Sequence, residues 1–189
     1  MRIITLPVGG LETNCYIVYQ EERDDAVIID PGADAEKIKH ALNGRKVAAV
    51  LLTHGHFDHT GALYAFADAP IYIHEQDAPM LTDSHFSFGL FSGDTKKRPP
   101  ATGFLTDGQV LDLAGIQFDV MSTPGHTRGS VCFKVGEDIF TGDTMFKGDY
   151  GRTDLPGGSM EAMRASLRRL FALVGCQIYP GHGPGDVIK

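Results

Sequence analysis

Residues 51–63 read LLTHGHFDHTGAL, and they place His54, His56, Asp58 and His59 directly after an apolar run. The apolar residues predict a buried strand, which a turn and a helix should follow. In an extended segment His54 and His56 are two residues apart, so their side chains share one face. Asp58 and His59 come where the chain turns, and they can therefore face a second point nearby. The segment predicts a strand that is followed by a cluster of side chains able to bind metal ions.

Ligand-type side chains also follow three other predicted strands. His126 comes after MSTPG, Asp143 after IFTG and His182 after IYPG. An earlier strand ends in Asp30, which is a candidate hydrogen-bond partner for one of the histidines. Strand ends that meet at one edge of a two-sheet structure can present all of these groups to a common point. We therefore expect them to combine into one site.

The combined ligand set holds five histidines and two aspartates. Imidazole and carboxylate without thiolate suit zinc, iron or manganese. A structural zinc site closes four ligands, usually including cysteines, around one ion, so this set is too large for one closed site. It predicts two divalent metal ions that share one carboxylate and hold a hydroxide nucleophile at neutral pH. Zinc is the expected metal, and iron and manganese are the alternatives.

Strand-like and helix-like segments alternate along the first half of the chain, and consecutive strands follow. Strands are predicted at residues 2–8, 14–20, 25–30, 47–53, 71–75, 116–123, 130–135, 138–143 and 176–182, and helices at 30–44, 60–68 and 158–173. This order predicts an α/β fold in which two mixed β-sheets are covered by outer helices. From Asp83 to Asp107 the pattern lapses, which predicts a long functional loop. The length of 189 residues predicts a single domain, residues 1–189.

Composition narrows the class of protein. A formal net charge of −7 argues against a dedicated nucleic-acid binder, which would present a basic surface. No apolar run is long enough to cross a membrane, and the first residues lack a secretory pattern. Cys15, Cys132 and Cys176 are far apart in sequence and favour a reducing compartment. We expect a cytoplasmic protein with a small-molecule substrate and with no nucleic-acid or membrane partner.

Four segments resemble, in order, the metal motifs of the metallo-β-lactamase-fold hydrolases: THGHFDHTGA, TPGHTRGS, FTGDTMF and YPGHGP. The resemblance covers nearly the whole chain. It implies a four-layer αβ/βα sandwich with the metal ions at one edge. It also implies that the first ion is held by His54, His56 and His126, the second by Asp58, His59 and His182, and that Asp143 bridges them.

A narrower resemblance concerns residues 148–159, GDYGRTDLPGGS, which are similar to the segment after the bridging aspartate in the glyoxalase II group. It implies that Lys147, Tyr150 and Arg152 contact the thiol end of the substrate. Two-domain glyoxalase II enzymes add a C-terminal helical domain that binds glutathione, whereas this chain ends at Lys189 and resembles the single-domain members. We expect the long loop, or a second subunit of a homo-oligomer, to supply the missing part of the substrate wall.

The resemblance implies a binuclear metal-dependent thioesterase that cleaves S-acyl-thiol esters, such as S-lactoylglutathione, by attack of a metal-bridging hydroxide. Asp58 is expected to bind one ion and, as the catalytic residue, to orient the hydroxide. A thiol leaves readily as thiolate, because its pKa is about 8.5, so no separate general acid is needed. Three alternatives stay open: a mono-iron persulfide dioxygenase, whose motifs include GRTD; a lactonase or phosphodiesterase on the same metal core; and a metal-dependent binding or scaffold module.

Overall fold

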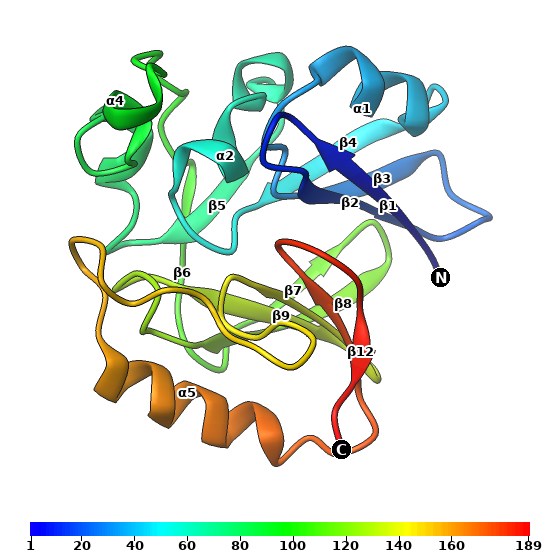
Figure 1. Cartoon of the computed structure of the whole chain (residues 1–189). Coiled ribbons are helices and arrows are strands. Elements are labelled where there is room, and N and C mark those ends of the chain that lie inside the picture. Colours follow the sequence, from blue (N-terminus) through cyan, green and yellow to red (C-terminus); the bar gives the residue numbers. More distant parts are fainter.

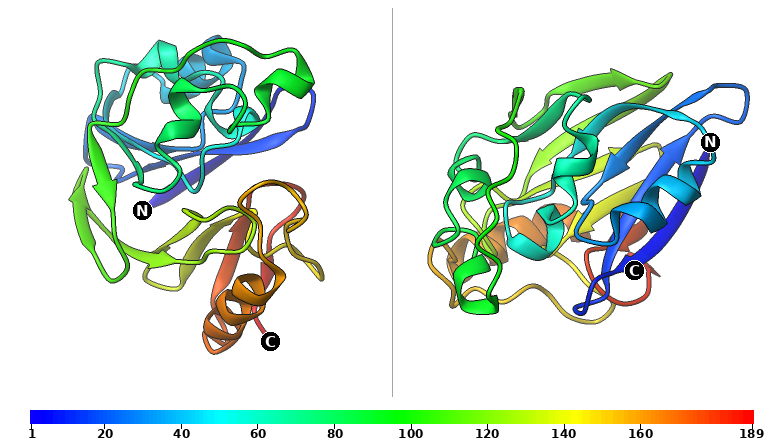
Figure 2. Two further views of the ribbon diagram at one scale, coloured as in Figure 1. Left: turned by 90° about the vertical axis from the view of Figure 1, so that its left-hand side faces the viewer. Right: turned by 90° about the horizontal axis from the view of Figure 1, so that it is seen from above.

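Two six-stranded β-sheets lie face to face, and helices cover their outer sides (Figures 1 and 2). This is a computed structural model, which describes residues 1–189 apart from the side chain of residue 91. Each sheet contains both parallel and antiparallel neighbours. The predicted four-layer αβ/βα sandwich with two mixed sheets is therefore confirmed.

The first sheet follows the order of the chain. It consists of β1 (Arg2–Val8), β2 (Thr13–Tyr19), β3 (Asp25–Ile29), β4 (Lys46–Leu51), β5 (Ile71–His74) and β6 (Gly103–Leu105). β1, β2 and β3 are antiparallel, and β3 to β6 are parallel. The parallel strands are rich in buried Val, Ile and Ala, as expected of strands covered on both faces. Because β3 and β4 run in the same direction, they end at the same edge of the sheet.

The second sheet contains the rest of the strands. It consists of β7 (Val110–Leu113), β8 (Ile116–Ser122), β9 (Val131–Val135), β10 (Asp138–Gly142), β11 (Gln177–Pro180) and β12 (Asp186–Val187). All neighbours are antiparallel except β10 and β11, which are parallel. A parallel pair needs a long crossover, and here the crossover contains α5 (Met160–Phe171). β10 and β11 therefore also end at a common edge.

The helices are divided between the two outer sides (Figure 1). The first sheet carries α1 (Ala35–Leu42), α2 (Phe57–Thr60), the 3₁₀ turn η1 (Leu63–Phe66), α3 (Pro79–Thr82) and α4 (Gly89–Ser92). The second sheet carries α5, which Ser159 caps by accepting a hydrogen bond from the backbone N–H of Ala162. In the described part of the chain, none of these helices has the length and apolar character that crossing a membrane requires.

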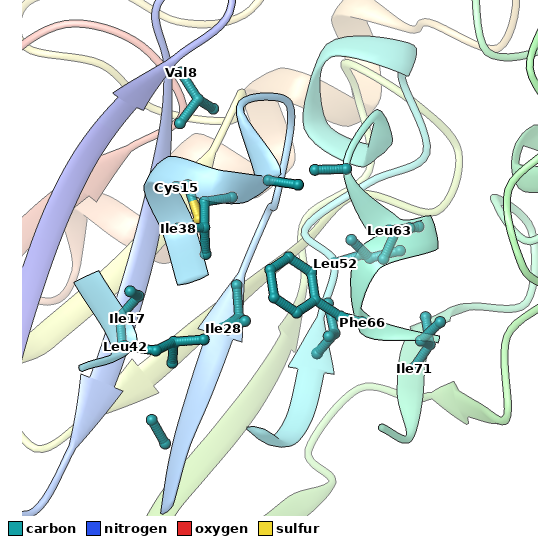
Figure 3. Packing of buried hydrophobic residues seen from close by; sticks show 14 of the residues in the cluster. Val8, Cys15, Ile17, Ile28, Ile38, Leu42, Leu52, Leu63, Phe66 and Ile71 are labelled. Atoms are coloured by element: carbon teal, nitrogen blue, oxygen red, sulfur yellow. The ribbon is translucent and has the colours of Figure 1, made fainter. Parts of the chain in front are cut away.

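Three apolar clusters fill the spaces between the four layers. In the first, Ile38 and Leu42 of α1 pack over Ile17 and Ile28 of the first sheet (Figure 3). The second lies between the sheets and contains the fully buried ring of Phe118. The third joins α5 to the second sheet. Because the middle cluster contacts both sheets, it fixes how their edges are aligned.

Several short elements differ from the sequence prediction, and α3 is one that it missed. Residues 60–68, predicted as one helix, form only the end of α2 and the turn η1. The predicted loop from Asp83 to Asp107 contains α4 and β6, and the strands β7 and β12 were also missed. β6 is three residues long and pairs with β5, which lies far earlier in the sequence. Strand formation here depends on that distant pairing, which a local pattern does not reveal.

We predict that Phe118→Ala lowers the free energy of unfolding by about 3–5 kcal/mol, because it leaves a cavity between the two sheets. Phe171→Ala is the matched control, since the ring of Phe171 is 56% exposed and its removal should change stability by about 0.5 kcal/mol or less. Urea unfolding of both variants measures the difference. Equal effects of the two substitutions would contradict the assignment of Phe118 to the central core.

Candidate metal centre

The seven predicted ligands come from four segments at one edge of the two sheets. His54 and His56 lie between β4 and α2, and Asp58 and His59 lie in α2 itself. The other three lie on the second sheet: His126 between β8 and β9, Asp143 directly after β10 and His182 after β11. The common edges of the parallel pairs β3–β4 and β10–β11 bring these segments together.

The ligand atoms form three overlapping groups, and within each group they lie within 4.8 Å of one another. The groups are His54, His56 and His126; His54, His59 and Asp143; and Asp58, His59 and His182. The first and third groups have the same members as the two sets implied by the resemblance, and Asp143 lies between them. The structure thus brings all seven residues together, while the assignment of each to a particular ion stays a prediction.

The buried nitrogen atoms of this cluster fit divalent metal ions. Nε2 of His54, His56 and His59 is buried and has no hydrogen-bond partner among the described residues, and the same holds for Oδ1 of Asp143. Native proteins leave few buried polar atoms unpaired. Nδ1 of His56 also lies 2.8 Å from Nε2 of His126, so these two nitrogens face the same point. Imidazole and carboxylate groups placed in this way can coordinate zinc, iron or manganese.

Asp30 orients two of the histidines from behind. It is 1% exposed, and its Oδ2 accepts hydrogen bonds from Nδ1 of His59 at 2.9 Å and from Oγ1 of Thr53 at 2.6 Å. Thr53 Oγ1 in turn lies 3.1 Å from Nδ1 of His54. With Nδ1 engaged in this way, Nε2 of both rings faces the cluster. A metal-binding histidine usually has such a partner on its other nitrogen, and the prediction that Asp30 supplies one agrees with this geometry.

Backbone carbonyl groups orient two further histidines. Nδ1 of His126 donates to the carbonyl oxygen of Arg152 at 2.8 Å, and Nδ1 of His182 donates to that of Leu11 at 3.1 Å. In addition, Oγ1 of Thr13 donates to Oδ2 of Asp58 at 3.0 Å. Sequence analysis missed these partners because a carbonyl group carries no residue-specific signal. Thr13 and Thr53 could not be identified from the sequence either, because threonine residues are common beside strand ends.

Burial determines the protonation of His54 and His56 in the first group. It lowers the pKa of His54 well below the usual value, and the neighbouring imidazoles lower it further. Burial and His126 together lower the pKa of His56 to about 3. Both rings are therefore neutral at physiological pH, and neutral imidazole is the form that binds a metal ion.

The second group contains negative charge that favours a cation. Burial alone would lower the pKa of His59, but the carboxylates of Asp58 and Asp143 raise it well above its usual value. The pKa of His182 is likewise raised by its hydrogen bond to Asp58, against the effect of burial. Burial would raise the pKa of both carboxyl groups, but His59 keeps each of them low. A proton on these rings, or a metal ion between them, balances the charge.

The ligand cluster opens into a cleft of about 350 Å³, which includes His56, Asp58, His126, Asp143 and His182 in its wall. Phe88, Ser92 and Leu155 are among the other residues that line it. An adjoining hollow of about 440 Å³ shares Asp58 and Ser92 with the cleft and extends along the turn between β1 and β2. A small molecule can therefore reach the cluster, and residues of the predicted loop form part of the wall.

The three predicted substrate contacts lie in different places. Arg152 lines the cleft, although its guanidinium group is exposed and pairs with Asp154 at 2.7 Å. Tyr150 lines a separate hollow beside α5 and the last residues of the chain. Lys147 is exposed in the turn between Phe146 and Asp149. The structure thus brings only Arg152 to the cleft, and contact of all three with a substrate stays a prediction.

Comparison with known proteins agrees with this geometry. The family model of the metallo-beta-lactamase superfamily matches residues 8–182. The chain is 35% identical over 196 residues to the hydroxyacylglutathione hydrolase GloC of Haemophilus influenzae, in a match that covers 97% of this chain and 91% of that protein. It therefore belongs to the metallo-β-lactamase superfamily, and the resemblance of its four motifs to that superfamily is confirmed.

Two solved structures are similar over nearly the whole chain. The BLEG-1 B3 metallo-beta-lactamase superposes with a TM-score of 0.93 and is 34% identical, covering 99% of this chain and 94% of its own. TTHA1623 in a di-iron-bound form superposes with a TM-score of 0.86 and is 36% identical in sequence. The match covers 100% of this chain and 95% of the TTHA1623 chain. The fold is shared with both.

We predict that acid releases one ion before the other. His59 and His182 have raised pKa values, so protons compete with metal for these rings as the pH falls below neutral. The pKa values of His54 and His56 are lowered, so protons compete there only in stronger acid. Dialysis of metal-loaded protein between about pH 8 and about pH 5, with elemental analysis, should remove one ion per chain and leave the other bound. Loss of both ions in one step would contradict this order.

Proposed function

We propose that the protein is a binuclear metal-dependent hydrolase that acts as a thioesterase on small S-acyl-thiol esters. The observation that carries this proposal is the convergence of five imidazoles and two carboxylates, several of them buried without hydrogen-bond partners, at the base of a cleft. The similarity of this chain to the hydroxyacylglutathione hydrolase GloC supports a thioester as the class of substrate. We further propose that the protein acts in the cytoplasm.

Two divalent ions, when bound, supply a hydroxide nucleophile at neutral pH and polarise the substrate carbonyl group. The ligand residues leave the outer side of the cluster open toward the cleft, where a carbonyl group can approach. Oδ2 of Asp58 accepts from Thr13 and lies 3.3 Å from Nε2 of His182, so the carboxylate is held in one orientation. In that orientation it can accept a hydrogen bond from a hydroxide held by the ions and orient it toward the carbonyl carbon, which is the catalytic role we propose for Asp58.

The leaving group favours a thioester over an amide. A departing thiol has a pKa of about 8.5 and leaves as thiolate without a proton donor, whereas an amide nitrogen must be protonated as it leaves. Apart from the seven proposed ligands, the described polar residues of the cleft wall are Ser92 and Arg152. Neither is an acid near neutral pH. The cleft therefore lacks an obvious side chain that would assist a nitrogen leaving group.

The similarity to BLEG-1 nevertheless makes β-lactam hydrolysis a second candidate activity. The iron content of TTHA1623 likewise keeps iron beside zinc as a candidate metal. A substrate panel that includes a β-lactam, a lactone and a phosphodiester, run on the zinc-loaded and the iron-loaded protein, separates these activities. An oxygen electrode with a persulfide substrate tests for a mono-iron dioxygenase.

We predict rapid thiol release from S-lactoylglutathione by the metal-loaded protein, because the proposed nucleophile and the polarised carbonyl group both depend on the ions. Treatment with a chelator should abolish this release, and added zinc or iron should restore it. The release is followed with a thiol-reactive dye. Protein that contains two ions per chain but releases no thiol would contradict the thioesterase proposal while leaving the metal site in place.

We predict that Asp58→Asn retains part of the metal but lowers kcat by about 10²-fold or more, because a neutral amide binds and orients the hydroxide more weakly than a carboxylate does. Thiol release and metal content are measured on the same sample. Asp68→Asn is the control, since Asp68 is exposed in the segment between η1 and β5. Near wild-type turnover in Asp58→Asn would remove the catalytic role of Asp58.

A further inference from the structure

Asp77 is a buried carboxylate outside the ligand cluster that contacts both ligand loops of the first group. It lies in the turn between β5 and α3 and is 0% exposed. Sequence analysis gave it no role. Its own turn is held by hydrogen bonds from the N–H of Asp77 to the carbonyl oxygen of His74 and from the N–H of Met80 to that of Asp77.

The carboxylate of Asp77 accepts three hydrogen bonds from these loops. Oδ2 accepts from the backbone N–H of Gly55 at 3.1 Å and from Oγ1 of Thr127 at 2.6 Å. Oδ1 accepts from the backbone N–H of Gly129 at 2.8 Å. Gly55 lies between His54 and His56, and Thr127 directly follows His126. One side chain thus connects the backbones that carry all three histidines of the first group.

The packing around Asp77 shows the same connection independently of the hydrogen bonds. A Cβ atom at Gly129 would lie 2.7 Å from Cγ of Asp77, and one at Gly55 would lie 2.6 Å from Cβ of Met80. Both distances are too short for real atoms, so each loop touches the turn of Asp77 with no room for a side chain. The loops have little freedom to move relative to this turn.

The two loops belong to different sheets. The His54–His56 loop follows β4 of the first sheet, whereas the loop of His126 connects β8 and β9 of the second. The backbone N–H of Val131 donates to the carbonyl oxygen of Thr53 at 2.8 Å and joins the two sheets just before His54. Asp77 joins them further along, beside His56 and His126, whose facing nitrogens are 2.8 Å apart. A buried carboxylate that binds both loops can set that distance because its hydrogen bonds involve a charged group and are shielded from water.

We propose that Asp77 is the positioning residue for the first metal ion: by holding the two loops together, it sets the distance between the imidazoles and hence the affinity for that ion. Asp77 does not contact the imidazoles and acts through the backbone of Gly55 and the side chain of Thr127. This inference rests on the proposed binuclear metal centre and adds the residue that determines the strength of one half of it.

The test is zinc titration of the metal-free protein against a chromophoric chelator. Asp77→Asn keeps the shape of the side chain but replaces one accepting oxygen with an NH₂ group, which cannot accept from these donors. We expect one of the two ions to bind about 10–100-fold more weakly, and the other to bind as in the wild type. The ¹H–¹⁵N spectra of the imidazole rings identify the weakened ion, because His54, His56 and His126 should return to their metal-free positions.

Thr127 provides a matched pair of variants that leaves Asp77 in place. Thr127→Val removes the hydroxyl donor at almost constant volume, and Thr127→Ser keeps it. The valine variant should weaken the same ion as Asp77→Asn, and the serine variant should bind it nearly as the wild type does. If the Asp77→Asn variant does not fold, this pair of variants still tests whether the hydrogen bond to Asp77 sets the affinity for the first ion.

Three results would overturn the proposal: wild-type affinity for both ions in Asp77→Asn, equal weakening of both ions, or equal behaviour of the valine and serine variants. The zinc titration of the wild-type protein tests the proposed function separately, because uptake of fewer than two ions would contradict a binuclear centre. The ratio of the zinc affinity of the variant to that of the wild type tests the proposed role of Asp77.

Discussion

Five imidazole rings lie side by side at the edge of the sandwich, and several of their nitrogens have no hydrogen-bond partner among the described residues. A buried polar atom without a partner costs about 1–3 kcal/mol, so this arrangement opposes folding unless something binds there. Divalent ions would replace most of these missing hydrogen bonds with coordinate bonds. Part of their binding free energy would then become stability of the fold.

The surrounding structure keeps these rings together by supports that come from both sheets. Asp30 and Thr53 hold His59 and His54 from the first sheet, and the carbonyl group of Arg152 holds His126 from the second. The segment that carries His182 is tied to β2, because the side chain of Asn14 donates to the carbonyl groups of Pro180 and Gly183. The geometry of the centre therefore depends on how the two sheets are aligned.

Sequence analysis could find the ligands because their residue types are distinctive and each follows an apolar strand. His54, His126 and His182 all stand out in this way. It could also predict the two-sheet architecture, because alternation and apolar runs are local properties of the sequence. Asp77 could not be found, since an aspartate after IHEQ reads as an ordinary solvated turn residue. Its role depends on Gly55 and Thr127, which reach it only in the folded protein.

The order of the ligands along the chain has a consequence for how the centre is assembled. The three histidines of the first group are complete once synthesis has passed His126, whereas the second group needs His182. β11, which positions His182, pairs with β10 in parallel across the long crossover through α5, and contacts of this kind form slowly. One half of the centre thus has all its ligands while the chain is still being made, and the other half is completed only when β11 joins the sheet.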